Sequence, residues 1–243
     1  MNNIIKIVLI GLFLSSIGCR HKSSDNKRIR HSTIVTSNQE IKRTHTNNSP
    51  IDQRHSDKKL DGTEIFRRYE TAVFMIFTSD GQQNFQGSGF FINKNGLAVS
   101  NYHIFKGTTI GREQIKLSND NTIYNVTEII YKNNDEDFII FRVNCNNTNY
   151  IPIASSKPQI GEKVYAIGSP RGLENTFSSG EISQWRDINL MQISALIDHG
   201  SSGGALINEY GEAVGITSGS FADGSQANLN YAWSINVIKP YIK

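Results

Sequence analysis

One glycine-flanked serine, Ser202, is the residue of this sequence best suited to nucleophilic chemistry. A serine hydroxyl is a weak nucleophile until a base takes its proton and nearby donors stabilise the developing negative charge. Gly200 can adopt a backbone conformation closed to other residues, so that neighbouring N–H groups converge on one point. We interpret Gly203 and Gly204 as leaving space for a substrate backbone. Because a Ser-Gly-Gly turn between strands is also a common structural element, the rest of the chain must supply the base.

Two histidines lie beyond residue 60, and His103 is the better candidate for that base. His103 directly follows residues 97–102, a strand-like run that ends in polar residues, and its imidazole is therefore expected at a strand end. His199 precedes Ser202 by only three residues. Its ring can seldom reach the serine oxygen while the amides of the same loop face that site. We therefore interpret His103 as the general base.

An imidazole base needs a hydrogen-bond acceptor that fixes its tautomer and stabilises its charged form. Asp135, Glu136 and Asp137 come directly before an apolar run at 138–143. Asp137 adjoins that run, so we favour it as the acceptor and interpret the other two as solvated loop charges. Cys145 follows the same run without glycine flanks, and we interpret it as an ordinary thiol.

The elements that must position these side chains are short strands. From residue 60 onward, apolar or alternating runs recur between turn residues. They cover residues 72–78, 88–92, 97–101, 114–117, 126–131, 138–143, 163–167, 190–194, 205–207, 213–218 and 231–234. Many short strands at this spacing predict an all-β barrel or sandwich, and about 184 residues suffice for two small barrels.

Local signals also predict turns and short helices. Residues 93–96 (NKNG) and 208–211 (NEYG) have the composition of hairpin turns. Asp61 or Thr63 is suited to cap a short helix that ends near Tyr69, and residues 236–242 are interpreted as a closing helix.

Five stretches occur in order along the chain: GSGFFI (87–92) with GLAVSNYH (96–103), DFII (137–140), GEKVYAIGSPRGLE (161–174), GSSGGAL (200–206) and NYAWSI (230–235). Together they resemble the motifs of the HtrA/Deg family of trypsin-like serine proteases, and the resemblance covers residues 63–243. It implies a chymotrypsin-like double β-barrel with the site between the barrels. It also implies peptide hydrolysis that needs neither metal nor cofactor.

The resemblance assigns roles to individual residues. It implies a triad of nucleophile, base and orienting carboxylate, an oxyanion hole of backbone amides and a substrate pocket. The triad is Ser202, His103 and Asp137; the oxyanion hole is Gly200, Ser201 and Ser202; the pocket residues are Leu196, Ile197, Thr217 and Ser218. No acidic residue is well placed at the pocket by sequence, so we expect a small or medium apolar side chain before the cleaved bond.

The chain departs from the family pattern in several places. Ser201 stands where the family usually has asparagine, so an ion pair with a newly cleaved N-terminus is not expected. Asp198 and His199 replace the usual lead-in to the glycine, which can alter the resting shape of the oxyanion loop. The segment 182–190 is short for a regulatory loop, and no PDZ domain is expected before the chain stops at Lys243.

The N-terminal region predicts export. Residues 7–17 form a mostly apolar run, too short to span a bilayer but suited to a secretion signal. Gly18-Cys19 after it resembles a bacterial lipoprotein signal in which Cys19 is lipidated, although Ser16 stands where that pattern favours leucine. We therefore expect a signal peptide over 1–19 and a membrane-anchored lipoprotein of the bacterial cell envelope. The alternative is a plain secretory signal with an incidental cysteine.

A polar, basic segment follows at residues 20–59. Few large apolar residues occur in it, so we expect a disordered tether ahead of a folded domain at 60–243. The tether carries a net charge of +6, whereas the folded domain carries −4. This division argues against nucleic-acid binding by the domain and favours an anionic membrane surface for the tether. Its four widely spaced histidines do not match a compact metal site.

Two functions are compatible with these patterns. The first is a membrane-tethered serine endopeptidase that acts on polypeptides in envelope quality control or processing. The second is a binding or sensor module that keeps the protease fold with little or no turnover.

Overall fold

The computed structural model describes residues 58–118, 122–169, 175–220 and 229–242, all within one compact unit, residues 50–243. The expected signal peptide, Cys19 and all but the last two residues of the expected tether lie outside the described residues. Within the described ranges, no helix is long and apolar enough to cross a membrane.

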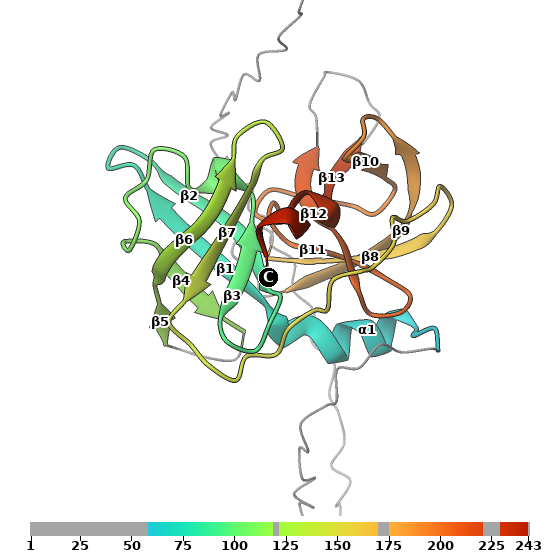
Figure 1. The fold of residues 1–243 in the computed structure, drawn as a ribbon, viewed down its shortest axis with the longest axis horizontal. Helices are drawn as coiled ribbons and strands as arrows, with labels where there is room; N and C mark the ends of the chain where they lie inside the picture. Colours follow the sequence, from blue (N-terminus) through green and yellow to red (C-terminus); the bar gives the residue numbers. More distant parts are fainter. Residues whose placement is uncertain (1–57, 119–121, 170–174, 221–228, 243) are drawn as a thin grey trace, which may run out of the picture. The chain divides into compact units, whose positions relative to one another are not determined.

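The first half of the unit is a seven-stranded antiparallel sheet in the order β5-β4-β1-β2-β3-β7-β6 (Figure 1). Its strands are β1 (Val73–Ser79), β2 (Asn84–Phe91), β3 (Leu97–Ser100), β4 (Gln114–Leu117), β5 (Ile123–Tyr124), β6 (Val126–Asn133) and β7 (Phe138–Val143). The curved sheet encloses an aromatic cluster in which the rings of Phe74 and Phe91 lie 4.7 Å apart and those of Phe105 and Phe141 5.2 Å apart. We call this half the first barrel.

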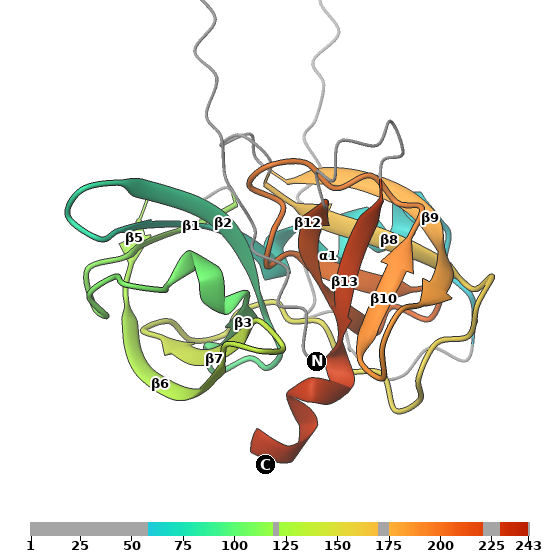
Figure 2. The same ribbon diagram turned by 90° about the horizontal axis from the view of Figure 1, so that it is seen from above.

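The second half is a closed six-stranded barrel in the order β10-β13-β12-β11-β8-β9. Its strands are β8 (Lys163–Gly168), β9 (Thr176–Trp185), β10 (Leu190–Ile193), β11 (Ala205–Asn208), β12 (Ala213–Ser220) and β13 (Asn230–Ser234). The two halves lie side by side (Figure 2). This arrangement confirms the expected all-β, chymotrypsin-like double barrel.

A shared apolar core joins the halves. Phe90 and Ile140 of the first barrel belong to the same buried cluster as Ile167 and Ile207 of the second. Burial of such side chains removes apolar surface from water and stabilises the arrangement. The relative position of the two halves is therefore fixed by packing, which is what a site built from both of them requires.

One short helix precedes the sheet. Helix α1 (Gly62–Tyr69) begins as expected, because Asp61 accepts a hydrogen bond from the Glu64 amide at 2.8 Å and forms a capping box. The expected closing helix is instead a pair of 3₁₀ turns, η4 (Ile235–Val237) and η5 (Lys239–Tyr241). Proline lacks the N–H that a continued α-helix needs, and Pro240 lies in the second turn.

Both expected hairpin turns are present. Gly96 adopts φ +76° and Gly211 adopts φ +81°, a region that favours glycine. At each turn the first asparagine side chain accepts two backbone hydrogen bonds. Two strands, the two-residue β5 and the long β9, lie outside the runs expected from the sequence.

Candidate active site

His103 and Asp137 form a two-point contact at the edge of the first barrel. The Asp137 Oδ2 atom lies 2.8 Å from His103 Nδ1, and Asp137 Oδ1 accepts a hydrogen bond from the His103 amide at 2.8 Å. His103 lies in the 3₁₀ turn η2 (Tyr102–Ile104), directly after β3, and its ring is half-exposed. Because both carboxylate oxygens contact the same residue, the imidazole is held with Nε2 available for chemistry.

The turn that carries Asp137 has an unusual shape. Asp137 adopts φ +46°, one of two non-glycine residues in the described ranges with a positive φ. Its carbonyl accepts hydrogen bonds from the Asn101 side chain at 2.8 Å and the Tyr102 amide at 3.3 Å. The second barrel adds a third contact to the carboxylate, from Ser218 Oγ to Asp137 Oδ2 at 3.1 Å. The orientation of the carboxylate is thus set by residues from both halves.

The loop of Ser202 is ordered by its own backbone and by β12. Gly200 adopts φ +93° and Gly203 φ +85°, so the loop uses conformations that suit glycine. The Gly203 amide donates to the Thr217 carbonyl at 2.7 Å, and Thr217 Oγ1 donates to the Ser201 carbonyl at 2.7 Å. These bonds hold the serine loop against the second barrel.

The same loop contacts the first barrel through Ser88. The Ser88 amide donates to the Ser202 carbonyl at 2.8 Å, and Ser88 Oγ donates to the Gly200 carbonyl at 2.7 Å. A Cβ at Gly203 would lie 2.1 Å from the Ser88 carbonyl oxygen, and one at Gly204 would lie 2.5 Å from the Ile167 carbonyl oxygen. The interpretation of these two glycines as room for a substrate is therefore wrong. They permit close packing of the loop against strands.

The amides of the serine loop differ in their partners. The Ser201 amide donates to the Asp198 carbonyl at 2.9 Å. Within the described ranges, the Gly200 and Ser202 amides make no hydrogen bond. A loop that presents two unpaired N–H groups next to a serine can hold an anionic oxygen.

The Ser202 hydroxyl also makes no hydrogen bond within the described part of the chain, and none joins it to His103. A Cβ at Gly219 would lie 3.3 Å from Ser202 Oγ, so this glycine leaves the space next to the hydroxyl open. Nucleophile–base hydrogen bonds are often long or misaligned in unliganded sites and shorten when substrate binds.

The four expected pocket residues occupy different environments. The Leu196 side chain is 67% exposed, whereas Ile197 is only 7% exposed and packs into the core of the second barrel. Thr217 and Ser218 direct their hydroxyls to Ser201 and Asp137, as described above. Of the four, Leu196 alone therefore presents a large exposed apolar surface.

Three residues near the triad make contacts that the sequence did not predict. Glu136 was interpreted as a solvated loop charge, but its Oε1 accepts a hydrogen bond at 2.6 Å from Asn189 of the second barrel. Ser88 and Asn101 support the site through hydrogen bonds that join distant segments. No spacing in the sequence signals these contacts, because each depends on tertiary packing: Asn101 meets Asp137 within the first barrel, and the other two contacts join the two halves.

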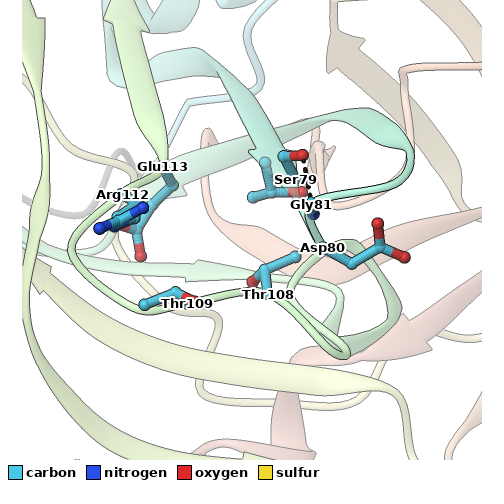
Figure 3. A pocket seen from close by; sticks show the side chains of 8 residues that line it. Ser79, Asp80, Gly81, Thr108, Thr109, Arg112 and Glu113 are labelled. Atoms are coloured by element: carbon cyan, nitrogen blue, oxygen red, sulfur yellow. Dashed lines mark hydrogen bonds between the residues drawn. The ribbon is translucent and has the colours of Figure 1, made fainter.

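Other reactive or ionisable groups lie away from this site. Burial raises the pKa of the Cys145 thiol to about 11, so the thiol is neutral and unreactive at neutral pH. A cavity of about 270 Å³ in the first barrel lies between Glu113 and Arg112 on one side and Ser79 and Asp80 on the other (Figure 3). In the described ranges, no group of three or more His, Cys, Asp or Glu residues is arranged to hold a metal ion.

Comparison with known proteins gives one consistent family. Residues 87–216 match the family model described as "Trypsin-like peptidase domain". The "Serine protease HTRA2, mitochondrial" of Drosophila virilis is 32% identical over 186 residues, which cover 72% of this chain and 43% of that protein. Its Drosophila willistoni counterpart is also 32% identical, over 72% of this chain and 42% of that protein. The chain thus spans less than half the length of these relatives.

A solved structure shares the fold. The "Crystal structure of the serine endoprotease from Yersinia pestis" superimposes with a TM-score of 0.66 at 27% sequence identity. The alignment covers 76% of this chain and 66% of that chain.

Proposed function

Because this chain belongs to the trypsin-like peptidase family and is HtrA-like, we propose that it is a serine endopeptidase that hydrolyses peptide bonds in proteins. The observation that carries the proposal is the two-point contact between His103 and Asp137. An imidazole held this way by a carboxylate, in the same compact unit as a glycine-flanked serine, is the arrangement needed to activate a hydroxyl.

The proposed reaction is acyl transfer through a covalent intermediate. Ser202 Oγ attacks the peptide carbonyl carbon while His103 Nε2 takes the hydroxyl proton, and the tetrahedral intermediate collapses as His103 returns that proton to the leaving amine. Water then attacks the acyl-enzyme by the same route and releases the second product. Asp137 keeps the ring oriented and stabilises its charged form.

The negative charge that develops on the carbonyl oxygen needs donors. The unpaired amides of Gly200 and Ser202 support their proposed role as the oxyanion hole, while Ser201 shapes the loop. In a protease from which one such donor was removed, the transition state lost on the order of 3 kcal/mol of stabilisation.

Polypeptides are the proposed substrates. The exposed side chain of Leu196 supports a preference for a small or medium apolar residue before the cleaved bond. Ile197, Thr217 and Ser218 would contribute through their backbone or by supporting the pocket wall.

We also propose that the protein acts in the bacterial cell envelope, in quality control or processing of exported proteins. The support is the sequence alone: the signal-like run that ends at Gly18-Cys19 and the basic segment 20–59. Cys19 would carry the lipid, and the segment would add attraction to anionic headgroups.

The test of the peptidase proposal is labelling of the full chain by a fluorophosphonate probe, together with cleavage of an unfolded protein substrate. We expect the wild type to be labelled and active, and Ser202→Ala to lose both properties. Ser183→Ala, which changes an exposed serine on β9, is the matched control and should behave like the wild type. A folded wild-type chain that neither reacts nor cleaves would refute the proposal.

A second candidate is a binding or sensor module with this fold and little turnover. It is favoured by the lack of a hydrogen bond between His103 and Ser202 within the described residues and by the unusual Asp198-His199 lead-in. Replacement of the chromosomal copy by Ser202→Ala separates the two candidates. A phenotype equal to that of a deletion strain favours the peptidase, whereas a wild-type phenotype favours the binding module.

Membrane attachment has its own test. The full chain with Cys19→Ser should bind vesicles that contain anionic lipid and should dissociate as salt screens the basic segment. Binding that does not change with salt would contradict attraction by the segment.

A further inference from the structure

We propose that Glu136, paired with Asn189 across the two barrels, is a positioning residue for the catalytic Asp137. The catalytic significance of this role rests on the proposed peptidase function, whereas one of the two measurements that test it does not require turnover. Glu136 touches neither His103 nor Ser202 by any hydrogen bond within the described residues, so it acts through its neighbour in the chain.

The backbone of Asp137 needs external support. An L-residue at positive φ lies in a region disfavoured by contact between its Cβ and the backbone. Asp137 at φ +46° holds this conformation while its carboxylate makes three hydrogen bonds. If the turn relaxed toward a favoured conformation, the carboxylate would swing away from His103.

Glu136 joins its own turn to the second barrel. Its Oε1 atom accepts a hydrogen bond from Asn189 Nδ2 at 2.6 Å. Its Oε2 atom accepts one from Asn133 Nδ2 at 3.4 Å, and the Glu136 amide donates to Asn133 Oδ1 at 3.1 Å. The carboxylate next to Asp137 in the chain therefore connects the start of the turn to a residue in the other half of the molecule.

The backbone of Asn189 is itself held by hydrogen bonds. Its carbonyl accepts a hydrogen bond from the Ser234 amide of β13 at 2.8 Å. The turn before β10 is closed by bonds from the Arg186 and Asp187 amides to the Leu190 carbonyl at 2.8 and 3.4 Å. A side chain can position its partner only if its own backbone is held, and Asn189 meets this condition.

Two contacts across the barrels thus act on the same turn. Ser218 binds the Asp137 carboxylate directly, and Asn189 binds Glu136, the preceding residue. Ser218 and Asn189 are both half-buried, so water competes less for these two hydrogen bonds than at a fully exposed site. Loss of the second contact leaves Asp137 attached to the second barrel at one point, about which the turn can rotate.

The test compares five variants and one control variant of the full chain with the wild type. Glu136→Ala and Asn189→Ala each remove the contact, and Glu136→Gln keeps an acceptor without the charge. Asn189→Asp opposes two carboxylates, and the double variant Glu136→Gln/Asn189→Asp restores one donor and one acceptor in the reverse sense. Asp135→Ala is the matched control, because Asp135 is an exposed carboxylate on the same turn whose side chain makes no hydrogen bond in the described ranges.

Two readouts separate positioning from general stability. The first is the low-field proton resonance of His103 Nδ1, which reports its hydrogen bond to Asp137 and does not require turnover. The second is the division between kcat and KM for a peptide substrate. We expect Glu136→Ala, Asn189→Ala and Asn189→Asp to broaden or lose the resonance and to lower kcat at least tenfold with KM nearly unchanged. Glu136→Gln, the double variant and Asp135→Ala should stay close to the wild type.

Other results would overturn the proposal. It fails if Glu136→Ala and Asn189→Ala match Asp135→Ala in both readouts, or if Glu136→Gln loses as much as Glu136→Ala, which would assign the effect to charge. If Glu136→Ala does not fold, Asn189→Asp and its rescue by the double variant decide the question. A wild type without turnover refutes the peptidase, whereas the resonance still decides the positioning role.

Discussion

Replacement of Gly203 by alanine should displace the serine loop. It should also lower the free energy of unfolding more than the same replacement at another glycine with the same backbone conformation. Gly203 adopts φ +85° and Gly161 adopts φ +86°. The two sites differ in their surroundings. A Cβ at residue 161 meets nothing within 4 Å, whereas one at residue 203 lies 2.1 Å from the Ser88 carbonyl oxygen and 2.3 Å from Ser100 Oγ.

The magnitude follows from this difference. At both sites, the left-handed backbone costs an L-residue about 1–2 kcal/mol, partly offset by about 0.4–1 kcal/mol of lost freedom in the unfolded chain. At Gly203 alone, the overlap must push the loop from the first barrel, which costs about 1–3 kcal/mol. That movement also breaks the bond from the Ser88 amide to the Ser202 carbonyl, at about 1 kcal/mol.

We therefore expect Gly203→Ala to lose about 2–4 kcal/mol more of the free energy of unfolding than Gly161→Ala. Denaturant titration of the two full-length variants measures this difference, and fluorophosphonate labelling follows Ser202. Gly161→Ala should keep labelling near the wild-type rate, while any folded Gly203→Ala should react far more slowly. Equal midpoints for the two variants would refute the reasoning, since only backbone strain would then matter.

Three further predictions concern single groups. Ser218→Ala removes one hydrogen bond to the Asp137 carboxylate and should lower kcat/KM about tenfold in a steady-state assay, and an unchanged value would show that the bond is dispensable. Because burial raises the pKa of Cys145 to about 11, little thiolate exists at pH 8, so iodoacetamide should alkylate the native thiol about a hundredfold more slowly than the denatured one. Burial also raises the pKa of Glu113, so the folded state favours the protonated carboxyl and loses stability as pH rises through the ordinary range of glutamate. Glu113→Gln should therefore increase the free energy of unfolding at pH 7 but not at acidic pH, and an equal gain at both would contradict this cause.

Much of the fold follows from local sequence signals. The runs at 114–117 and 138–143 match β4 and β7, because side-chain alternation and turn residues act over a few neighbours. The hairpin at 93–96 and the cap at Asp61 are likewise local. Strand β9 was missed because its exposed and half-buried residues do not alternate, and because it contains Gly180, where a Cβ would lie 2.2 Å from the Ala195 amide nitrogen.

The candidate site likewise combines residues that the sequence identified with environments that it did not predict. Ser202, His103 and Asp137 were found from residue types, strand ends and family motifs, and the contact between His103 and Asp137 is present in the structure. Their catalytic roles stay predictions. Leu196 and Ile197 are adjacent in sequence, yet one is exposed and the other is in the barrel core, a difference that the types of the two residues do not signal.

The sequence by itself determined the chemical groups and the local elements that carry them, because these depend on side-chain type and on contacts between near neighbours. Only the tertiary structure decided which groups meet across the two barrels. Ser218 binds Asp137 from 81 residues away, and Asn189 binds Glu136 from 53 residues away. Such contacts depend on the packing of a shared apolar core, and no single stretch of the chain can form that core by itself.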